Sequence, residues 1–247
     1  MSQRAHELLE QSDFIAGYST YIDLIKDTIG NKNIISTGMT KEVERVKMAI
    51  DKAMSGTTCA LISGGDAGIY AMAGLVFELC RKKKLNLVRY GSKQKIDKAP
   101  LSLEIEIVPG IPALASGAAL LGAPLTHDFA AVSLSDLLTP WKKIEKKLDA
   151  AASADFVIVI YNPKSKKRSW QLGKAQEIIL RHRNPDTPVG IVTSAMRDQQ
   201  QISITPLKDI NNAEVGMQTT LFVGNSSSIE YLNFMYTPRG YAEKYTF

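Results

Sequence analysis

The chain has 247 residues, of which 45% are hydrophobic and 7% aromatic, and its formal net charge of +5 is moderate. No apolar run approaches the ~20 residues that span a bilayer, and two cysteines with three scattered histidines give neither a disulfide framework nor a metal-ligand spacing. We therefore expect a soluble cytoplasmic protein without a membrane, metal or nucleic-acid partner, since nucleic acid would need a broader basic surface with interleaved aromatic side chains.

Apolar strand-like runs alternate with helical patterns along the chain, and this alternation predicts an α/β fold with a largely parallel sheet. In the first half we expect strands at residues 14–16 and 103–107, and a helix that is capped by Thr40 and ends at Gly56. Residues 85–98 are polar, lysine-bearing and weakly periodic, so we expect a long connection there.

The most informative local pattern is the passage from an apolar run at residues 59–62 into Ser-Gly-Gly-Asp at residues 63–66. An apolar helical pattern follows from Ile69 to Cys80, so the sequence predicts a strand, a tight turn and a helix. The two glycines let backbone amides approach a ligand closely, and Asp66 either caps the helix or accepts hydrogen bonds from a ligand. The alternative is that this turn only changes the direction of the chain.

A second glycine turn, Val-Pro-Gly-Ile-Pro-Ala at residues 108–113, leads into a helix of small residues over 114–121. Gly-Ala-Pro at 122–124 breaks this helix, so we expect an N-terminal α/β domain over residues 1–122 and a C-terminal α/β domain over residues 123–247. The second half repeats the alternation, with a helix at 170–180 and strands at 156–160, 189–192, 202–204 and 221–223.

Part of the positive charge lies in two runs. Residues 81–84 follow a predicted helix, where cations complement the negative end of the helix dipole and stay solvated. Residues 164–168, Lys-Ser-Lys-Lys-Arg, come directly after an apolar strand and a Tyr-Asn-Pro turn, where a ligand-facing loop would lie. A solvated loop surface is the alternative for this second run.

Six segments together resemble one known family. They are Gly-Tyr-Ser-Thr-Tyr at 17–21, residues 63–70, residues 108–113 with 121–125, His-Asp-Phe at 127–129 with Ser-Leu-Ser-Asp-Leu-Leu-Thr-Pro-Trp at 133–141, Tyr-Asn-Pro-Lys-Ser at 161–165, and Thr-Pro-Arg-Gly-Tyr at 237–241. In this order they resemble the tetrapyrrole methylases, which use S-adenosyl-L-methionine, and the resemblance covers nearly all of the chain. Residues 133–141 are the most specific part and are most similar to members that methylate carbon 17 of a precorrin or cobalt-precorrin, with ring contraction, in cobalamin biosynthesis.

The resemblance implies two α/β domains with an active-site cleft between them, a homodimer, and a tetrapyrrole as the small-molecule substrate. The positions that match the family's cofactor-binding residues are Gly64, Gly65, Asp66, Ile69, Tyr70, Pro112, Ala113, Tyr161, Asn162, Ala195, Met196, Thr220 and Val223. Small residues and free backbone groups suit the flat apolar slot that an adenine ring needs.

Ring contraction needs proton transfers, and the candidates for them all lie in the segments 127–129 and 133–141. They are Asp136, Ser135 and His127. Each has a structural alternative, because Asp136 would cap a helix starting near Leu137, Ser135 would satisfy local backbone groups, and His127 would pack beside Phe129. The carboxylates of the tetrapyrrole are expected to bind Lys164, Lys166, Arg168, Arg197 and Arg239.

One feature departs from the family pattern. Family members begin with an apolar strand and a Gly-x-Gly-Pro-Gly turn ahead of the first helix, whereas this sequence begins at that helix. We expect the lack of this strand and turn to leave backbone groups unpaired in the sheet of the first domain. Two alternatives to C17 methylation therefore stay open: a methylase acting at another ring carbon, and a non-catalytic protein that binds the cofactor or a tetrapyrrole.

Overall fold

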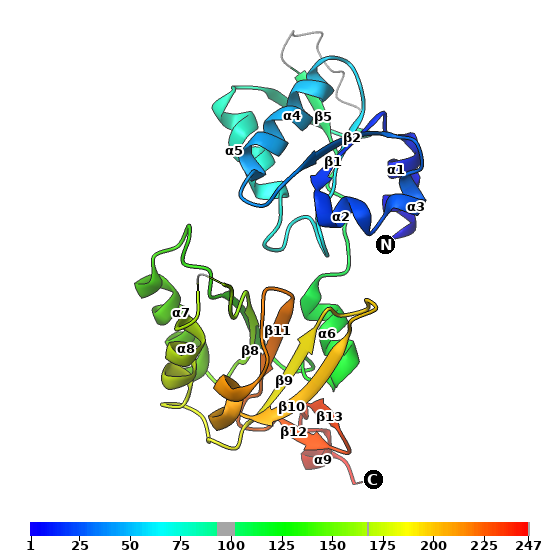
Figure 1. Cartoon of the computed structure of the whole chain (residues 1–247). Helices are drawn as coiled ribbons and strands as arrows, with labels where there is room; N and C mark the ends of the chain where they lie inside the picture. The colour runs from blue at the N-terminus through cyan, green and yellow to red at the C-terminus, as the bar shows by residue number, and fades with distance from the viewer. Residues whose placement is uncertain (93–101, 167, 247) are drawn as a thin grey trace. The chain divides into compact units, whose positions relative to one another are not determined.

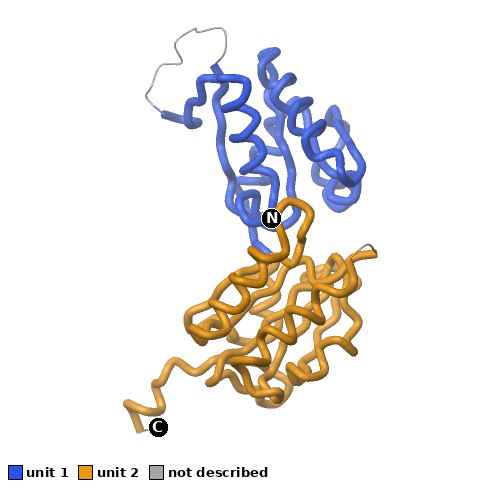
Figure 2. Tube along the Cα trace, turned by 90° about the vertical axis from the view of Figure 1, so that its left-hand side faces the viewer, with its two compact units in different colours: residues 1–112 blue, residues 113–247 orange. Residues whose placement is uncertain are grey.

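The computed structural model describes residues 1–92, 102–166 and 168–246. The chain forms two compact units, which Figure 2 shows in different colours: unit 1 is Met1–Pro112 and unit 2 is Ala113–Phe247. This division falls before helix α6 (Ala113–Leu121), whereas the boundary expected from the sequence falls after it. The reason is that apolar side chains of α6 pack on Val192 and Phe222 in the sheet of unit 2.

Unit 1 has helices on both faces of its strands (Figure 1). Its elements are α1 (Gln3–Gln11), β1 (Phe14–Tyr18), α2 (Ser19–Asp23), α3 (Lys26–Ile29), β2 (Asn33–Thr37), α4 (Glu42–Met54), β3 (Cys59–Leu61), α5 (Ala73–Lys82), β4 (Asn86–Arg89) and β5 (Ser102–Ile105). Strands β2, β1 and β3 form one parallel sheet, and β4 and β5 form a separate parallel pair. Val46 of α4 and Cys80 of α5 are buried in one apolar cluster, and Leu9 of α1 and Ile22 of α2 are buried in another. Among the described strands, β3 has no partner on the edge that faces away from β1.

Three local expectations for unit 1 are wrong. Part of the expected connection forms strand β4, which has too few apolar residues to give a pattern, while residues 93–98 of it lie outside the described residues. Helix α5 begins at Ala73, later than the apolar pattern from Ile69 predicts. Thr40 does not cap α4, because Lys41 stands at the N-cap position and Thr40 has a left-handed φ of 67°.

Unit 2 has a five-stranded sheet with helices on both faces (Figure 1). After α6 its elements are β6 (Gly122–Ala123), β7 (Phe129–Ser133), α7 (Trp141–Ser153), β8 (Val157–Tyr161), α8 (Gln171–Ile179), β9 (Pro188–Thr193), β10 (Gln201–Pro206), the 3-10 helix η1 (Leu207–Asn212), β11 (Thr219–Val223), β12 (Ile229–Tyr231), β13 (Phe234–Tyr236) and α9 (Tyr241–Lys244). The strand order is β10-β9-β11-β8-β7. Leu148, Ile179 and Ile210 are buried where α7, α8 and η1 cover one face, and Phe222 is buried under α6 on the other.

The α/β class expected from the sequence is confirmed, but the expected parallel direction holds for unit 1 alone. In the large sheet of unit 2, β7 and β8 are parallel, whereas β8, β11, β9 and β10 pair antiparallel in that order. The link between β9 and β10 is too short to hold a crossover helix, so β10 returns beside β9 in the opposite direction. Periodicity predicts strands without predicting their direction.

The helices of both units are short. The two longest in the described ranges, α4 and α7, have 13 residues each and bury one apolar face while exposing charged side chains on the other. Within those ranges, no helix combines the length and the apolar character that crossing a membrane requires.

Candidate functional site

The turn between β3 and α5 in unit 1 is held by the carboxylate of Asp66. One carboxylate oxygen accepts a hydrogen bond from the Gly68 amide at 2.8 Å, and the other accepts one from the Gly110 amide at 2.9 Å. These two hydrogen bonds lower the pKa of the Asp66 carboxyl because they stabilise its ionised form, and the bond from Gly110 has the larger effect. Asp66 therefore does not cap α5, which begins at Ala73, but ties its own turn to the Pro-Gly turn that follows β5.

At two glycines of unit 1, a side chain would collide with neighbouring atoms. A Cβ at Gly110 would lie 2.0 Å from the carbonyl oxygen of Gly65, and a Cβ at Gly64 would lie 2.7 Å from the ring of Tyr21. The hydroxyl of Ser63, next to them, is buried and has no hydrogen-bond partner among the described residues. A buried polar atom without a partner is uncommon, and it marks this turn as a place where a ligand hydrogen bond is available.

In unit 2, the carboxyl ends of β8 and β9 meet the amino end of β11, because β11 runs antiparallel to both. We call this end of the sheet the β8–β9 edge; it comprises Tyr161, Asn162, Ser194, Ala195, Met196, Thr219 and Thr220. The hydroxyl of Tyr161 accepts a hydrogen bond from the amide of Leu114 at 2.9 Å, which brings the start of α6, with Ala113, to the same edge. The structure thus brings together most of the cofactor positions expected in unit 2.

Several residues at these cofactor positions have a left-handed backbone. The φ angles are 51° for Tyr70 in unit 1, and 52° for Asn162 and 58° for Met196 in unit 2. Ser194, which the sequence analysis did not select, has a φ of 51° and donates its hydroxyl to the side chain of Gln218 at 2.7 Å. Non-glycine residues rarely adopt this conformation, and such residues concentrate at ligand sites. The outliers therefore support a binding role for both segments.

A polar group adjoins the β8–β9 edge on the side of β7. The side-chain amide of Asn162 donates to the hydroxyl of Ser133 at 3.0 Å, and the backbone amide of Ser135 donates to the same hydroxyl at 3.2 Å. Asp136 follows and accepts a hydrogen bond from the side-chain amide of Gln171 at 2.9 Å. The group therefore places Ser135 and Asp136 beside the edge and adds Gln171, which no sequence motif had indicated.

The structural alternative for Asp136 is wrong. Residues 134–140 form no helix, α7 begins only at Trp141, and Pro140 stands at its N-cap position. Asp136 is partly buried and leaves its second carboxylate oxygen without a hydrogen bond among the described residues. A partly exposed carboxylate with a free oxygen is suited to accept and return a proton.

Two other predicted site residues of unit 2 lie away from this group. His127 precedes β7 and so lies beyond the opposite end of that strand from Ser133, and the strand itself is about 13 Å long at a rise of ~3.3 Å per residue. Its ring nitrogen accepts a hydrogen bond from the amide of Asp128. Val223 is fully buried in the core that α7 and α8 cover. The structure therefore brings neither residue to the β8–β9 edge.

The basic run after β8 forms a tight turn that supports the edge. Ser165 and Arg168 exchange two backbone hydrogen bonds, and the guanidinium of Arg168 donates to the carbonyl of Asn162 at 3.0 Å. Lys164 lines an open groove of about 790 Å³ together with residues of β9, β10 and the segment 211–219. Lys166 is exposed, and Lys167 lies outside the described residues. The turn is thus partly structural through Arg168 and free to meet a ligand through its lysines.

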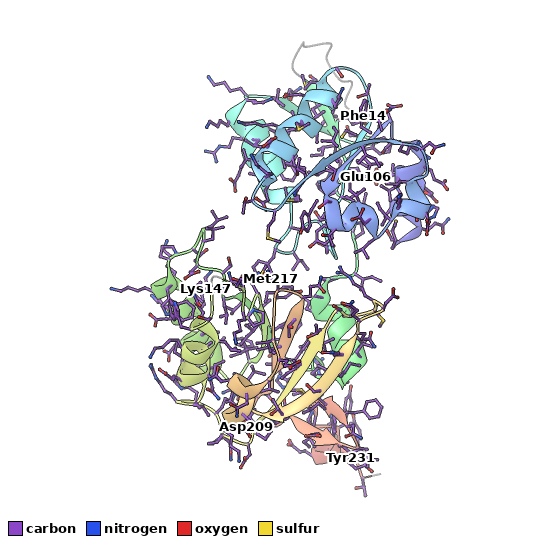
Figure 3. All side chains as sticks on the ribbon, in the orientation of Figure 1. Phe14, Glu106, Lys147, Asp209, Met217 and Tyr231 are labelled. Atoms are coloured by element: carbon purple, nitrogen blue, oxygen red, sulfur yellow. The ribbon has the colours of Figure 1, made fainter. Side chains whose placement is uncertain are left out.

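The remaining two cations differ in position. Arg197 follows Met196 and donates its amide to the carbonyl of Ser194, so it belongs to the β8–β9 edge. Arg239 follows β13, which pairs with β12. Figure 3 labels Tyr231 of β12 at one end of unit 2 and Met217, which contacts Arg168, at the other. The structure therefore does not bring Arg239 to the basic turn.

Comparison with known proteins shows the family to which the chain belongs. The model of the tetrapyrrole (corrin/porphyrin) methylase family matches residues 1–211. The chain is 51% identical over 246 residues to a cobalt-factor III methyltransferase of Priestia megaterium, covering 100% of this chain and 43% of that protein. It is 44% identical over 241 residues to a probable cobalt-factor III C(17)-methyltransferase of Salmonella typhimurium, covering 98% and 93%.

Among solved structures, the crystal structure of the methyltransferase CobJ superimposes with a TM-score of 0.82 at 31% identity. The match covers 96% of this chain and 93% of that one. The fold, the order of the motifs and the sequence similarity agree over almost the whole length. The chain belongs to the tetrapyrrole (corrin/porphyrin) methylase family.

Proposed function

We propose that this chain is an S-adenosylmethionine-dependent C-methyltransferase that methylates carbon 17 of a precorrin or cobalt-precorrin, with ring contraction, in cobalamin biosynthesis. The observation that supports this most is the 44% identity to the probable cobalt-factor III C(17)-methyltransferase, of which the chain covers 93%. The chain spans 43% of the relative from Priestia megaterium, so only the matched part of that protein bears on the proposal.

Each unit carries candidate cofactor contacts of its own: the turn after β3 in unit 1, and the β8–β9 edge in unit 2. The Ser63 hydroxyl has no hydrogen-bond partner among the described residues, and the apolar side chains of Ile69 and Tyr70 are exposed. These features fit a ligand with both polar and flat apolar parts. S-adenosylmethionine supplies an electrophilic methyl group from its sulfonium. The residues of the chain then hold the accepting ring carbon in line, and orientation of this kind contributes up to ~7–11 kcal/mol to acceleration.

Cofactor binding is tested by titration calorimetry with S-adenosylhomocysteine on Gly65→Val. Gly65 has a φ of 77°, and Gly91, with a φ of 71° and open space at its Cβ, offers a matched control for the same change in unit 1. We expect Gly65→Val to abolish binding and Gly91→Val to keep it, with circular dichroism confirming that both variants fold. Equal affinities of the two variants would remove this turn from the site.

The proton transfers of ring contraction fall to Asp136 with Ser135. Both lie beside Asn162 at the β8–β9 edge, whereas His127 does not. We expect Asp136→Asn to slow contraction by ~10²–10⁴-fold while methylated, uncontracted product accumulates. Asp128→Asn is the control, because this exposed carboxylate lies at the other end of β7 and its loss should leave turnover unchanged.

The reaction itself is tested by incubating the purified chain with cobalt-factor III and ¹³C-methyl S-adenosylmethionine. Mass spectrometry should show one methyl group added, and NMR should place it on carbon 17 of a contracted ring. A label on another carbon would identify a methylase of different regiochemistry. Cofactor binding without any transfer would identify a non-catalytic binding protein.

The carboxylates of the substrate bind the lysines of the basic turn and Arg197. Charge-assisted hydrogen bonds of this kind are roughly twice as strong as neutral ones, and salt screens those at the surface. Lys166→Glu should weaken tetrapyrrole binding at low salt and approach the parent protein at high salt. Arg239→Glu is the matched charge reversal at the other end of unit 2 and should change tetrapyrrole affinity little. If Arg239→Glu weakens tetrapyrrole binding more than Lys166→Glu does, the carboxylate site lies at Arg239.

The proposal extends to the assembly and the location of the protein. We place the reaction in the cytoplasm and expect a homodimer, as the family resemblance implies. Sedimentation velocity of the purified chain should then give twice the mass of 27.1 kDa. A monomer at micromolar concentration would contradict this part and leave the reaction as proposed.

A further inference from the structure

The carboxylate of Asp136 is held by one buried amide. Gln171 is the first residue of α8, its side chain is 3% exposed, and its amide nitrogen donates to Asp136 at 2.9 Å. Trp170, which precedes it, contacts Trp141 at the start of α7 edge to face, with ring centroids 4.9 Å apart. The contact between the two tryptophans thus joins the starts of α7 and α8, next to Gln171.

The other end of the same amide is unsatisfied. The side-chain carbonyl oxygen of Gln171, Oε1, is buried and accepts no hydrogen bond from any described residue. Leaving such an atom unpaired is costly, so its retention calls for an explanation. Because no second hydrogen bond fixes the amide, it is able to turn about its last side-chain bond.

A freely turning amide suits a carboxyl group that changes its protonation state. The NH₂ end donates to an ionised carboxylate, which only accepts hydrogen bonds, whereas the carbonyl end accepts from the hydroxyl of a protonated carboxyl. Lysine or arginine in this place would offer no acceptor to the hydroxyl of the protonated form. Gln171 thus complements both forms of Asp136 without moving its helix.

We propose that Gln171 is a positioning residue that holds the Asp136 carboxyl through both protonation states during ring contraction. This rests on the proposed function, in which Asp136 transfers a proton. When a substrate group gives its proton to Asp136, the bond between that group and the proton breaks, its electron pair stays on the substrate, and an O–H bond forms on the carboxyl. The proton later leaves to water, and Gln171 keeps the carboxyl aimed throughout.

The test uses Gln171→Met, which keeps length and burial but removes the amide, and Gln171→Asn, which keeps the amide but shortens its reach. Gln176→Met is the matched control, because Gln176 is buried in the same helix and its amide donates to the carbonyls of Leu207 and Lys208 at 2.7 and 2.8 Å. Each of the two Gln171 variants is also combined with Asp136→Asn in a double variant. Turnover, KM and the ratio of contracted to uncontracted product are measured on the full chain with cobalt-factor III.

We expect Gln171→Met and Gln171→Asn each to lower kcat for contraction about 10- to 100-fold, as misplacement by about 1 Å does, with KM changed less than about threefold. In the Asp136→Asn background neither should lower kcat further, since both changes act through one carboxyl. Gln176→Met should reduce thermal stability and leave the product ratio unchanged.

Three results would overturn the proposal. If the Gln171 variants turn over within about twofold of the parent while Asp136→Asn is impaired, Gln171 has no positioning role. If the effects multiply in the double variant, Gln171 acts on the fold and not through Asp136. If Asp136→Asn itself turns over normally, the acid–base role of Asp136 fails, and the role of Gln171 fails with it.

Discussion

Gly110→Ala tests how tightly two backbone turns of unit 1, those at Gly65 and Gly110, pack against each other. The added Cβ would lie 2.0 Å from the carbonyl oxygen of Gly65, 3.0 Å from its carbonyl carbon and 3.2 Å from the Cα of Asp66. All three contacts are backbone atoms, so no side chain can turn away to relieve them. The turns must separate, and the hydrogen bond from the Gly110 amide to Asp66 is strained with them.

The magnitude follows from the cost of overpacking, about 1–3 kcal/mol. At about 1.4 kcal/mol per factor of ten, this raises the equilibrium for opening unit 1 by about 5- to 150-fold. Cys59 and Cys80, the two cysteines of the chain, both lie in unit 1. Burial raises the pKa of the Cys59 thiol to about 11 and also raises that of Cys80, so both thiols are protonated at pH 8. Cys80 is fully buried as well, whereas Cys59 is partly exposed.

Labelling of Cys80 at pH 8, read by peptide mass spectrometry, therefore reports the opening of unit 1, and its rate should rise by the same 5- to 150-fold in Gly110→Ala. Both tryptophans, Trp141 and Trp170, lie in unit 2, so their fluorescence shows independently that unit 2 stays folded during labelling. Gly38→Ala is the control, because a Cβ there meets nothing within 4 Å. Labelling of Gly110→Ala at the rate of Gly38→Ala would refute the reasoning.

Two further predictions concern the stability of unit 1. The pKa of Asp66 is lowered in the folded state, so its ionised carboxylate stabilises the fold above the ordinary carboxyl pKa of about 4. This stabilisation is lost as the pH falls through the lowered pKa. Urea unfolding followed by circular dichroism should show Asp66→Asn less stable than the parent protein at pH 6, with the difference in stability closing towards pH 3. Gly74→Ala should stabilise α5 by about 0.5–1 kcal/mol, because the site is helical and open, and a lower urea midpoint would contradict this.

Several elements of unit 2 could be predicted from the sequence, because their apolar runs are continuous and their breaks are sharp, whereas β7, α7, β12 and β13 are not among the expected elements. Helices α6 and α8 and strands β8, β9 and β11 lie within one or two residues of the expected positions. The antiparallel order of the sheet could not be predicted, since it depends on which strands find each other and not on local pattern. The same limit hides Gln171, whose role depends on a contact with a residue 35 positions away.

The capping alternatives for Asp66 and Asp136 are wrong for a common reason. In each case a short polar residue precedes apolar residues at helical spacing, yet the helix begins later, at Ala73 and at Trp141. The apolar residues in between stay exposed in the loop: Tyr70 is 54% exposed, and Leu138 is 93% exposed.

A periodicity rule assumes that the chain itself buries every apolar side chain that it counts. That assumption holds along α4 and α8, which pack on their own sheets, and it fails in these two loops. Exposed apolar side chains and free backbone groups are the surface that a bound cofactor or substrate would cover. The local rules thus break down at the two loops where the resemblance places the cofactor and the acid–base residues, as expected when a segment's chemistry, and not its own packing, determines its sequence.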